Sequence, residues 1–150
     1  SITRDLFVFP IEHVSGKLPS AQEDKSQVSR LDAVVINTND PDGFISLYRD
    51  KFGIRLALDK VIEEWKTRIL FFRINKTTIE VIEKQSEEKK AKDLLWGLSW
   101  NVENIKATHE RLIDLGVEVT DVRNGIKPDS LVCTVKSHTR GVPTLLIQHL

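Results

Sequence analysis

An acidic and a basic side chain lie close together in a predicted hairpin, where they could perform acid–base chemistry. A two-residue turn at residues 75 and 76 would place Phe71 directly opposite Glu80. One face of the hairpin then carries Ile69, Phe71, Arg73, Thr78, Glu80 and Ile82. On that face Arg73 can pair diagonally with Glu80 and keep the carboxylate ionised. The pattern predicts a general base at Glu80 beside an anchor for an anionic substrate at Arg73.

The hairpin belongs to the first of two copies of a unit made of a strand, a helix and three further strands. The first copy is predicted to contain a strand over 31–38, a helix and strands over 54–59, 66–74 and 77–83. Asp40 is a good N-cap for the helix and Pro41 suits its first position. Gly53 is expected to end it.

The second copy repeats the same order of elements. It is predicted to contain a strand over 96–102, a helix over 103–115 and strands over 117–123, 130–136 and 142–149. The charged stretch 84–94 joins the copies as a solvated linker. We therefore predict an α+β domain over 31–150, with module one at 31–83 and module two at 95–150.

The opening segment resembles the end of the chain. Residues 3–13 align without a gap to residues 139–149, and Thr, Arg, Ile and His are identical at four aligned positions. Residues 1–13 are therefore predicted to form an extra N-terminal strand like the last strand of a preceding module, with a polar linker over 14–30. The chain is then either part of a longer multi-module protein or a protein with an extra strand. Because an unpaired apolar strand is prone to association, we expect it to pair within the domain or across a homodimer.

Composition excludes several classes of function. The chain has 150 residues, no net charge and 40% hydrophobic residues, which predicts a domain with its own core and no electrostatic basis for binding nucleic acid. No apolar run is long enough to span a membrane, so no membrane partner is expected. The one cysteine, Cys133, favours a reducing compartment, and we predict a cytoplasmic location.

Two β-α-β-β-β copies with these residues resemble the vicinal oxygen chelate superfamily, which includes glyoxalase I, bleomycin-resistance proteins and extradiol dioxygenases. The resemblance covers roughly residues 31–150 and is clearest at LDAVV (31–35), LYRDKFGI (47–54), IEVI (79–82) and GVPTLLI (141–147). It implies that the two modules pair their sheets into a half-open cup, with helices outside and ligands inside.

The resemblance also implies where a metal would bind in metal-using members of the superfamily. Four positions facing into the cup hold the cation in those proteins, and here they correspond to Ala33, Glu80, Gly97 and Leu145. Only Glu80 can donate a ligand, and metal sites need several. We therefore predict no metal site and no cofactor.

The cup is also expected to contain the substrate-binding residues, namely Asn37, Phe71, Arg73, Trp96, Asn101, Arg123 and Lys127. Strand alternation places Asn37 on the face of Ala33. Arg123 and Lys127 flank a predicted turn where a substrate phosphate or carboxylate could dock. The alternative roles are packing for Trp96, solvated loop charges for Arg123 and Lys127, and an ion pair left from an ancestral metal site for Arg73 and Glu80.

Three functional hypotheses follow from this set of residues. The first is a metal-independent lyase or isomerase that acts on a small, anionic organic molecule with Glu80 as acid–base. The second is a binding protein of the bleomycin-resistance type, which needs shape and aromatic surface but no catalyst. The third is a degenerate module kept for architecture or dimerisation. The sequence leaves open whether the protein is an enzyme, and the small-molecule-binding domain is the common prediction.

Overall fold

The sheet at the centre of this computed structural model contains eight strands in the order β2-β3-β4-β1-β5-β8-β7-β6. The structure describes residues 3–6, 8–9, 11–12, 14–16, 27–83 and 93–150. The strands are β1 (Val28–Thr38), β2 (Arg55–Ile62), β3 (Thr67–Ile74), β4 (Thr77–Glu83), β5 (Leu94–Val102), β6 (Arg123–Asn124), β7 (Ser130–Val135) and β8 (Thr144–His149). The helical elements are α1 (Pro41–Ile45), the π-helical turn η1 (Ser46–Lys51), the 3-10 turn η2 (Glu63–Trp65) and α2 (Ile105–Asp114).

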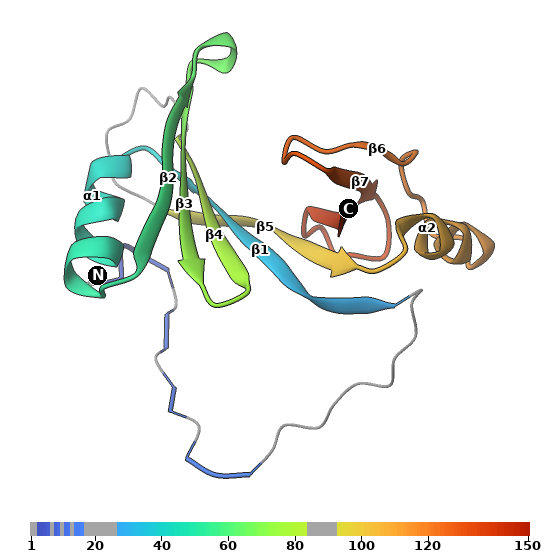
Figure 1. The fold of residues 1–150 in the computed structure, drawn as a ribbon, viewed down its shortest axis with the longest axis horizontal. Coiled ribbons are helices and arrows are strands. Elements are labelled where there is room, and N and C mark those ends of the chain that lie inside the picture. The colour runs from blue at the N-terminus through green and yellow to red at the C-terminus, as the bar shows by residue number, and fades with distance from the viewer. Residues whose placement is uncertain (1–2, 7, 10, 13, 17–26, 84–92) are drawn as a thin grey trace.

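The two predicted modules meet through their first strands. β1 pairs antiparallel with β5 and parallel with β4, while β5 pairs parallel with β8. β1 and β5 therefore occupy the middle of the sheet, with α1 beyond one half and α2 beyond the other (Figure 1). This arrangement confirms the predicted two-module α+β fold.

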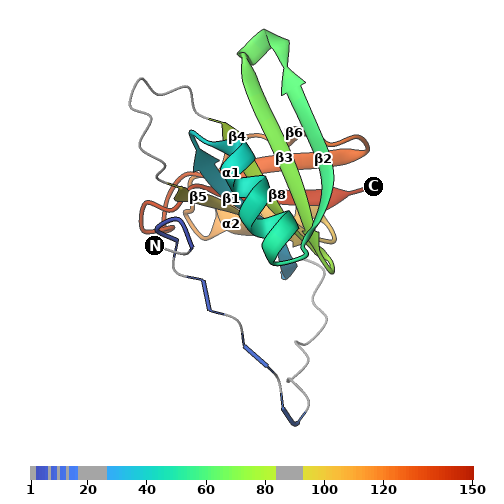
Figure 2. The same cartoon turned by 90° about the vertical axis from the view of Figure 1, so that its left-hand side faces the viewer.

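The helix of module one begins where the sequence predicts. The Asp40 side chain accepts a hydrogen bond from the Gly43 amide, and Pro41 occupies the start of α1. Phe44, Tyr48 and Phe72 then pack together, with the Phe44 and Tyr48 rings stacked 4.1 Å apart. This cluster fixes the helical segment against the strands of module one, which it crosses in Figure 2.

The helix of module two is fixed by its own cap and core. Asn104 accepts from the Ala107 amide, and Ile105 is fully buried beside Cys133. Burial raises the pKa of the Cys133 thiol to about 11, so this cysteine is a core residue rather than a reactive thiol. A positive φ of 74° at Gly116 ends the segment.

The predicted strand over 117–123 is wrong for most of its length. Only Arg123–Asn124 form a strand, and Val119 makes an isolated bridge to Val135. The Thr134 amide donates to the side-chain oxygen of Thr120 rather than to a backbone carbonyl. This side-chain acceptor interrupts the backbone ladder that a continuous strand requires.

The predicted N-terminal strand is absent from the described residues of that segment. Residues 3–6 form a turn closed by a hydrogen bond from the Leu6 amide to the Thr3 carbonyl. Phe9 is 75% exposed and Ile11 is 92% exposed, so these two side chains are not buried in the domain. Pairing of the segment across a homodimer stays a prediction. Residues 7, 10 and 13 lie outside the described residues, as does most of the linker 84–94.

The sequence match between the two ends of the chain nevertheless has a structural counterpart. Arg4 and Asp5 have φ values of 54° and 68°, and Arg140 and Gly141 have values of 54° and 80°. Each pair lies in a turn closed by the same hydrogen bond, from Leu6 to Thr3 or from Val142 to Thr139. The aligned sequences therefore form the same left-handed turn, even though a strand follows the second turn only.

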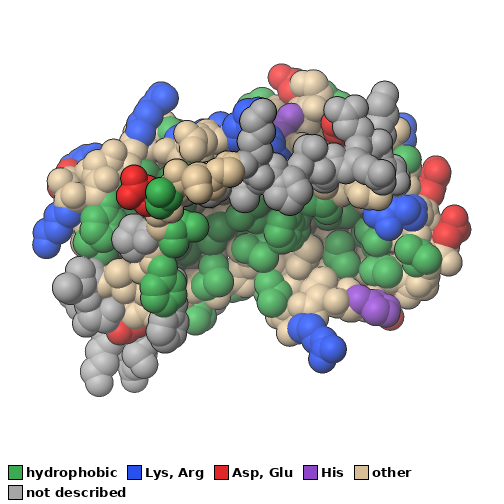
Figure 3. All heavy atoms as spheres, turned by 90° about the horizontal axis from the view of Figure 1, so that it is seen from below, with side chains coloured by type: hydrophobic (Ala, Val, Ile, Leu, Met, Phe, Trp, Pro, Cys, Tyr) green, Lys and Arg blue, Asp and Glu red, His purple; other side chains and the backbone are tan. Residues whose placement is uncertain are grey.

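Apolar side chains also reach the surface. Seen from below, they form a band across the middle of the molecule, with charged side chains mostly toward its margins (Figure 3). Exposed apolar surface of this kind is typical of protein–protein contacts. The homodimer itself stays a prediction. The described residues include no helix long and apolar enough to cross a membrane.

Candidate functional site

The concave region between the two halves of the sheet contains a cavity of about 290 Å³. β1 and β4 supply Val35, Glu80 and Ile82, and β5 and β8 supply Leu98, Ser99 and Leu145. Strand alternation explains this lining, because Val35 and Glu80 are paired neighbours that face the same side of the sheet. The lining is mostly apolar, and Glu80 is its acidic group.

Glu80 has no hydrogen-bond or ion-pair partner among the described residues. It pairs in the sheet with Val35 on one side and Phe71 on the other, as the two-residue turn predicts. Burial raises the pKa of Glu80, the positive charge of Lys127 opposes that shift, and the negative charge of Asp32 adds to it. A carboxyl group with a raised pKa binds a proton more readily than an exposed glutamate does, which suits it to acid–base chemistry.

The predicted ion pair between Arg73 and Glu80 is wrong. Arg73 donates from Nη1 to the Thr78 hydroxyl at 2.7 Å and lies in a second cavity instead. Thr78 is directly opposite Arg73 in the hairpin, so its hydroxyl is nearer than the diagonal carboxylate. Glu80 therefore lacks the counter-ion that the sequence predicts for it.

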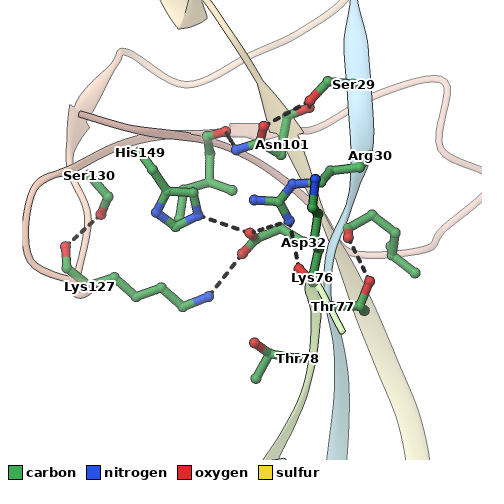
Figure 4. Close-up of polar contacts among 12 residues, drawn as sticks. Ser29, Arg30, Asp32, Lys76, Thr77, Thr78, Asn101, Lys127, Ser130 and His149 are labelled. Carbon is green, nitrogen blue, oxygen red and sulfur yellow. Dashed lines mark hydrogen bonds and ion pairs between the residues drawn. The ribbon is translucent and has the colours of Figure 1, made fainter. Parts of the chain in front are cut away.

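A second carboxylate, Asp32, is surrounded by basic groups (Figure 4). Its side chain is 3% exposed and lies 2.9 Å from Lys127 Nζ, 2.9 Å from His149 Nε2 and 3.2 Å from Arg30 Nη1. Burial opposes ionisation, but the hydrogen bonds and charges of Lys127 and His149 outweigh it and lower the pKa of Asp32. Asp32 is a satisfied carboxylate that fixes three side chains from different parts of the chain.

The sequence interpretation missed Asp32 because β1 is irregular at this residue. The register between β1 and β5 shifts between Leu31 and Ala33, so Asp32 is an extra residue of β1 with no opposite residue on β5. Asp32 therefore forms a β-bulge. Strict alternation had assigned the inner face to Ala33 and its alternate neighbours. The bulge at Asp32 supplies the partner of His149.

The second cavity has a volume of about 520 Å³ and a basic lining. Its polar residues are Arg30, Asp32, Arg73, Thr78, Lys127 and His149. Lys127 also lines the first cavity, and its Nζ lies 5.9 Å from the centre of the Phe71 ring. One ammonium group thus connects the apolar cavity of Glu80 to the basic cavity of Arg73.

The other predicted binding residues divide between the cavities and the sheet. Trp96 and Arg123 line the first cavity, and Phe71 lines the second. Asn101 instead accepts from the Ser29 hydroxyl at 2.8 Å, which is a contact within the sheet. Asn37 is 7% exposed and lines neither cavity. The binding roles of all seven residues stay predictions.

The four positions implied for a metal do not fit one. Ala33 is fully buried and Leu145 is apolar. A Cβ at Gly97 would lie 2.7 Å from the Pro143 carbonyl oxygen, so a ligand-bearing side chain does not fit there without a backbone shift. Across residues 27–83, 93–150 and the described N-terminal positions, no three His, Cys, Asp or Glu side chains are grouped to hold a metal.

Comparison with solved structures supports the fold. Methylmalonyl-CoA epimerase from Mycobacterium tuberculosis has a TM-score of 0.68 and 20% identity, covering 86% of this chain and 93% of that one. A hypothetical protein from Bacillus halodurans has a TM-score of 0.65 and 17% identity, covering 81% and 94%. A variant of Streptomyces coelicolor methylmalonyl-CoA epimerase in complex with 2-nitronate-propionyl-CoA has a TM-score of 0.65 and 20% identity, covering 82% and 99%.

Sequence comparison identifies the family. No curated protein sequence matches the chain. Residues 30–136 match the Glyoxalase/Bleomycin resistance protein/Dioxygenase superfamily, a span that runs from β1 to β7 but ends before β8. The chain belongs to the Glyoxalase/Bleomycin resistance protein/Dioxygenase superfamily.

Proposed function

We propose that the protein binds a small organic anion between its two modules and that Glu80 transfers a proton to or from it without a metal. The observation that carries this proposal is the unpartnered Glu80 carboxyl in the apolar cavity. A structural carboxylate at this depth would need hydrogen-bond donors or a paired cation. Asp32 has such partners, whereas Glu80 has none within the part of the chain that the structure describes, which makes Glu80 the group suited to proton transfer.

Lys127 would supply the complementary charge. In its ionised form Glu80 would remove a proton from a carbon next to a substrate carbonyl, and the electron pair of the broken C–H bond would move to the carbonyl oxygen. The Lys127 ammonium lines the same cavity and would stabilise the resulting enolate oxygen. Return of the proton to the opposite face of the carbon or to a neighbouring carbon would complete an isomerisation, and departure of a leaving group with its bonding electron pair from the next carbon would complete an elimination.

The basic cavity would bind the anionic part of the ligand. Arg30, Arg73 and Lys127 contribute three positive charges and Asp32 one negative charge, a balance of plus two before His149 is counted. The hydrogen-bond partner of the Arg73 guanidinium is the neutral Thr78 hydroxyl, which leaves donors for a carboxylate or phosphate. The shared residue Lys127 lets one ligand place its anionic group here and its reacting carbon beside Glu80.

A binding protein without catalysis is the second candidate. The first cavity has an apolar lining and includes Trp96, which would suit ligand sequestration by shape alone. In this case Glu80 would be dispensable for binding. The two candidates therefore differ in what removal of the carboxyl does.

The test is proton exchange at carbon in D₂O, followed by proton NMR. Candidate substrates are small 2-oxo acids and carboxylated acyl thioesters, including methylmalonyl-CoA because similar structures are epimerases of that compound. We expect Glu80→Gln to slow exchange by roughly 10²- to 10⁴-fold. Glu83→Gln is the matched control, since Glu83 lies on the same strand with the opposite parity.

Thermal stabilisation by the same compounds separates the two candidates. Binding that persists in Glu80→Gln, with no exchange in the wild-type protein, would favour sequestration over catalysis. Exchange that is equally fast in the wild type and in Glu80→Gln would reject Glu80 as the proton-transfer group. Absence of both binding and exchange across the panel would reject the proposal and favour a module kept for architecture.

A further inference from the structure

The N-terminal turn places one arginine in an enclosed group of oxygen atoms. Arg4 donates to both carboxylate oxygens of Asp93, from Nε at 2.6 Å and from Nη2 at 3.0 Å. Its Nη1 donates to Asp40 Oδ2 at 2.8 Å, and its Nη2 also reaches the Asp40 carbonyl at 3.2 Å and the Thr38 hydroxyl at 3.4 Å. All three nitrogen atoms of the guanidinium group therefore donate to oxygen atoms of Thr38, Asp40 or Asp93.

The carboxylate at the centre of this group is completely buried. The Asp93 side chain is 0% exposed, and the Arg4 side chain is 14% exposed. Thr38 donates its hydroxyl to Asp93 Oδ1 at 2.7 Å, which leaves Arg4 as the cation that compensates the buried charge. Without that cation, Asp93 would be an unpaired carboxylate in the protein interior, which is a strongly unfavourable state.

The surrounding residues leave space for a planar group. A Cβ at Gly43 would collide with Arg4 Nη1 and with Asp40 Oδ2, so the absence of a side chain at this residue admits the arginine. Leu6 packs against the core cluster of module one two residues after Arg4. Phe9, Ile11 and Val14 are by contrast highly exposed, so the contacts of Arg4 and Leu6 bury more of their side chains against the domain.

We propose that Thr38, Asp40 and Asp93 form a guanidinium-binding site, which Arg4 of the same chain fills and through which the N-terminal turn docks on module one. The site presents a bidentate carboxylate together with a second carboxylate oxygen, a geometry that suits a planar guanidinium and not a compact ammonium. None of its residues lines either cavity between the modules. Arg4 also lies outside the residues that match the superfamily. Rejection of the guanidinium-binding site would therefore leave the function proposed for the two cavities unaffected.

The test is chemical rescue in the full chain. Arg4→Ala should lower the Tm by roughly 10 °C or more, because it leaves a buried carboxylate unpaired. Millimolar methylguanidinium should then raise the Tm of this variant, whereas methylammonium should not. The wild-type protein should not respond to methylguanidinium, because Arg4 already fills the site.

Arg140→Ala is the matched control. Arg140 occupies the equivalent position in the second left-handed turn, and it forms no ion pair within the described part of the chain. Its removal should change the Tm by less than about 2 °C. An Arg4→Ala variant that is as stable as Arg140→Ala, or that responds equally to both cations, would overturn the proposal.

A refolding measurement and one further variant keep the test decisive. If Arg4→Ala does not fold alone, it should refold on dilution into methylguanidinium and not into methylammonium, and failure in both would reject the site. Asp93→Asn combined with Arg4→Ala removes both charges, so it should be more stable than Arg4→Ala alone and insensitive to methylguanidinium. Rescue that persists in the double variant would show that the cation acts elsewhere and would also reject the site.

Discussion

Two carboxyl groups on the inner side of the sheet have opposite surroundings. Asp32 accepts from Lys127 and His149 and its pKa is lowered, whereas Glu80 has no such partner among the described residues and its pKa is raised. They lie on the adjacent strands β1 and β4, and both respond to the charge of Lys127. The difference is therefore set by local donors and not by the half of the molecule in which each residue lies.

Asp32 has the surroundings of a structural carboxylate, whereas Glu80 has those expected of the proposed proton-transfer group. A buried carboxylate with several donors is held ionised and in a fixed orientation, and proton transfer would disrupt its contacts. A carboxyl group without such donors is neither held in the ionised state nor fixed in orientation. The organisation around Asp32 positions Lys127, and Lys127 then faces the cavity that contains Glu80.

The largest expected effect comes from removing the charge of Asp32. Asp32→Asn should lower the free energy of unfolding by roughly 3 kcal/mol, because Arg30, Lys127 and His149 lose a shared partner. Chemical denaturation at neutral pH would measure this decrease in the free energy of unfolding. Asp59→Asn is the control, since the Asp59–Arg68 pair is more exposed and should contribute less than about 1 kcal/mol. Equal effects in the two variants would show that Asp32 has no special structural role.

A smaller effect is expected from Lys127→Gln, which removes a partner of Asp32 and a positive charge near Glu80. Loss of the ammonium should raise the pKa of Glu80 further and weaken binding of an organic anion by roughly tenfold. Carboxyl-carbon NMR would measure the pKa, and calorimetry the affinity. Lys136→Gln serves as a control that lies outside both cavities. A Glu80 pKa that does not move in Lys127→Gln would contradict the inferred coupling.

The smallest effect concerns the pH dependence of stability. Glu80 has a folded-state pKa above its ordinary value of 4.5, so its contribution to stability should be lost as pH rises through and above that value. Asp32 has a folded-state pKa below 3.8, so its contribution is present at neutral pH and lost as pH falls below that value.

Glu80→Gln isolates the first of these two contributions. The variant should gain about 1 kcal/mol over the wild type at pH 8, because it no longer contains a poorly solvated carboxylate, and the gain should shrink toward pH 4. Thermal unfolding across this pH range would measure the difference. A gain that is constant with pH would show that ionisation of Glu80 is not its cause.

The sequence predicted most of the module architecture and one strand register in full. The two-residue turn fixed the pairing of Phe71 with Glu80, because hairpin register follows directly from turn length. The same argument failed for β1, where the bulge at Asp32 interrupts the alternation. Bulges arise from contacts between strands far apart in sequence, so local patterns do not reveal them.

The N-terminal segment shows a related limit of sequence patterns. The alignment of residues 3–13 with residues 139–149 predicts a shared strand, but what residues 3–6 and 139–142 share is a turn with positive φ values and the same closing hydrogen bond. After the second turn β8 pairs with β5 and β7, whereas no described residue of the N-terminal segment pairs with a strand. The ion pair of Arg4 with Asp93 spans 89 residues, and no local pattern in the sequence signals it.

The position of β1 and β5 has a consequence for the timescale on which parts of the molecule open. These strands are paired on both edges, so exposure of all their amides to solvent requires β1 and β5 to separate from each other and from β4 and β8. β2 is paired with β3 alone and lies at the edge of the sheet (Figure 1). Deuterium should therefore enter β2 long before it enters the centre, and the slowest amides of Ala33–Ile36 should report the lifetime of the whole fold.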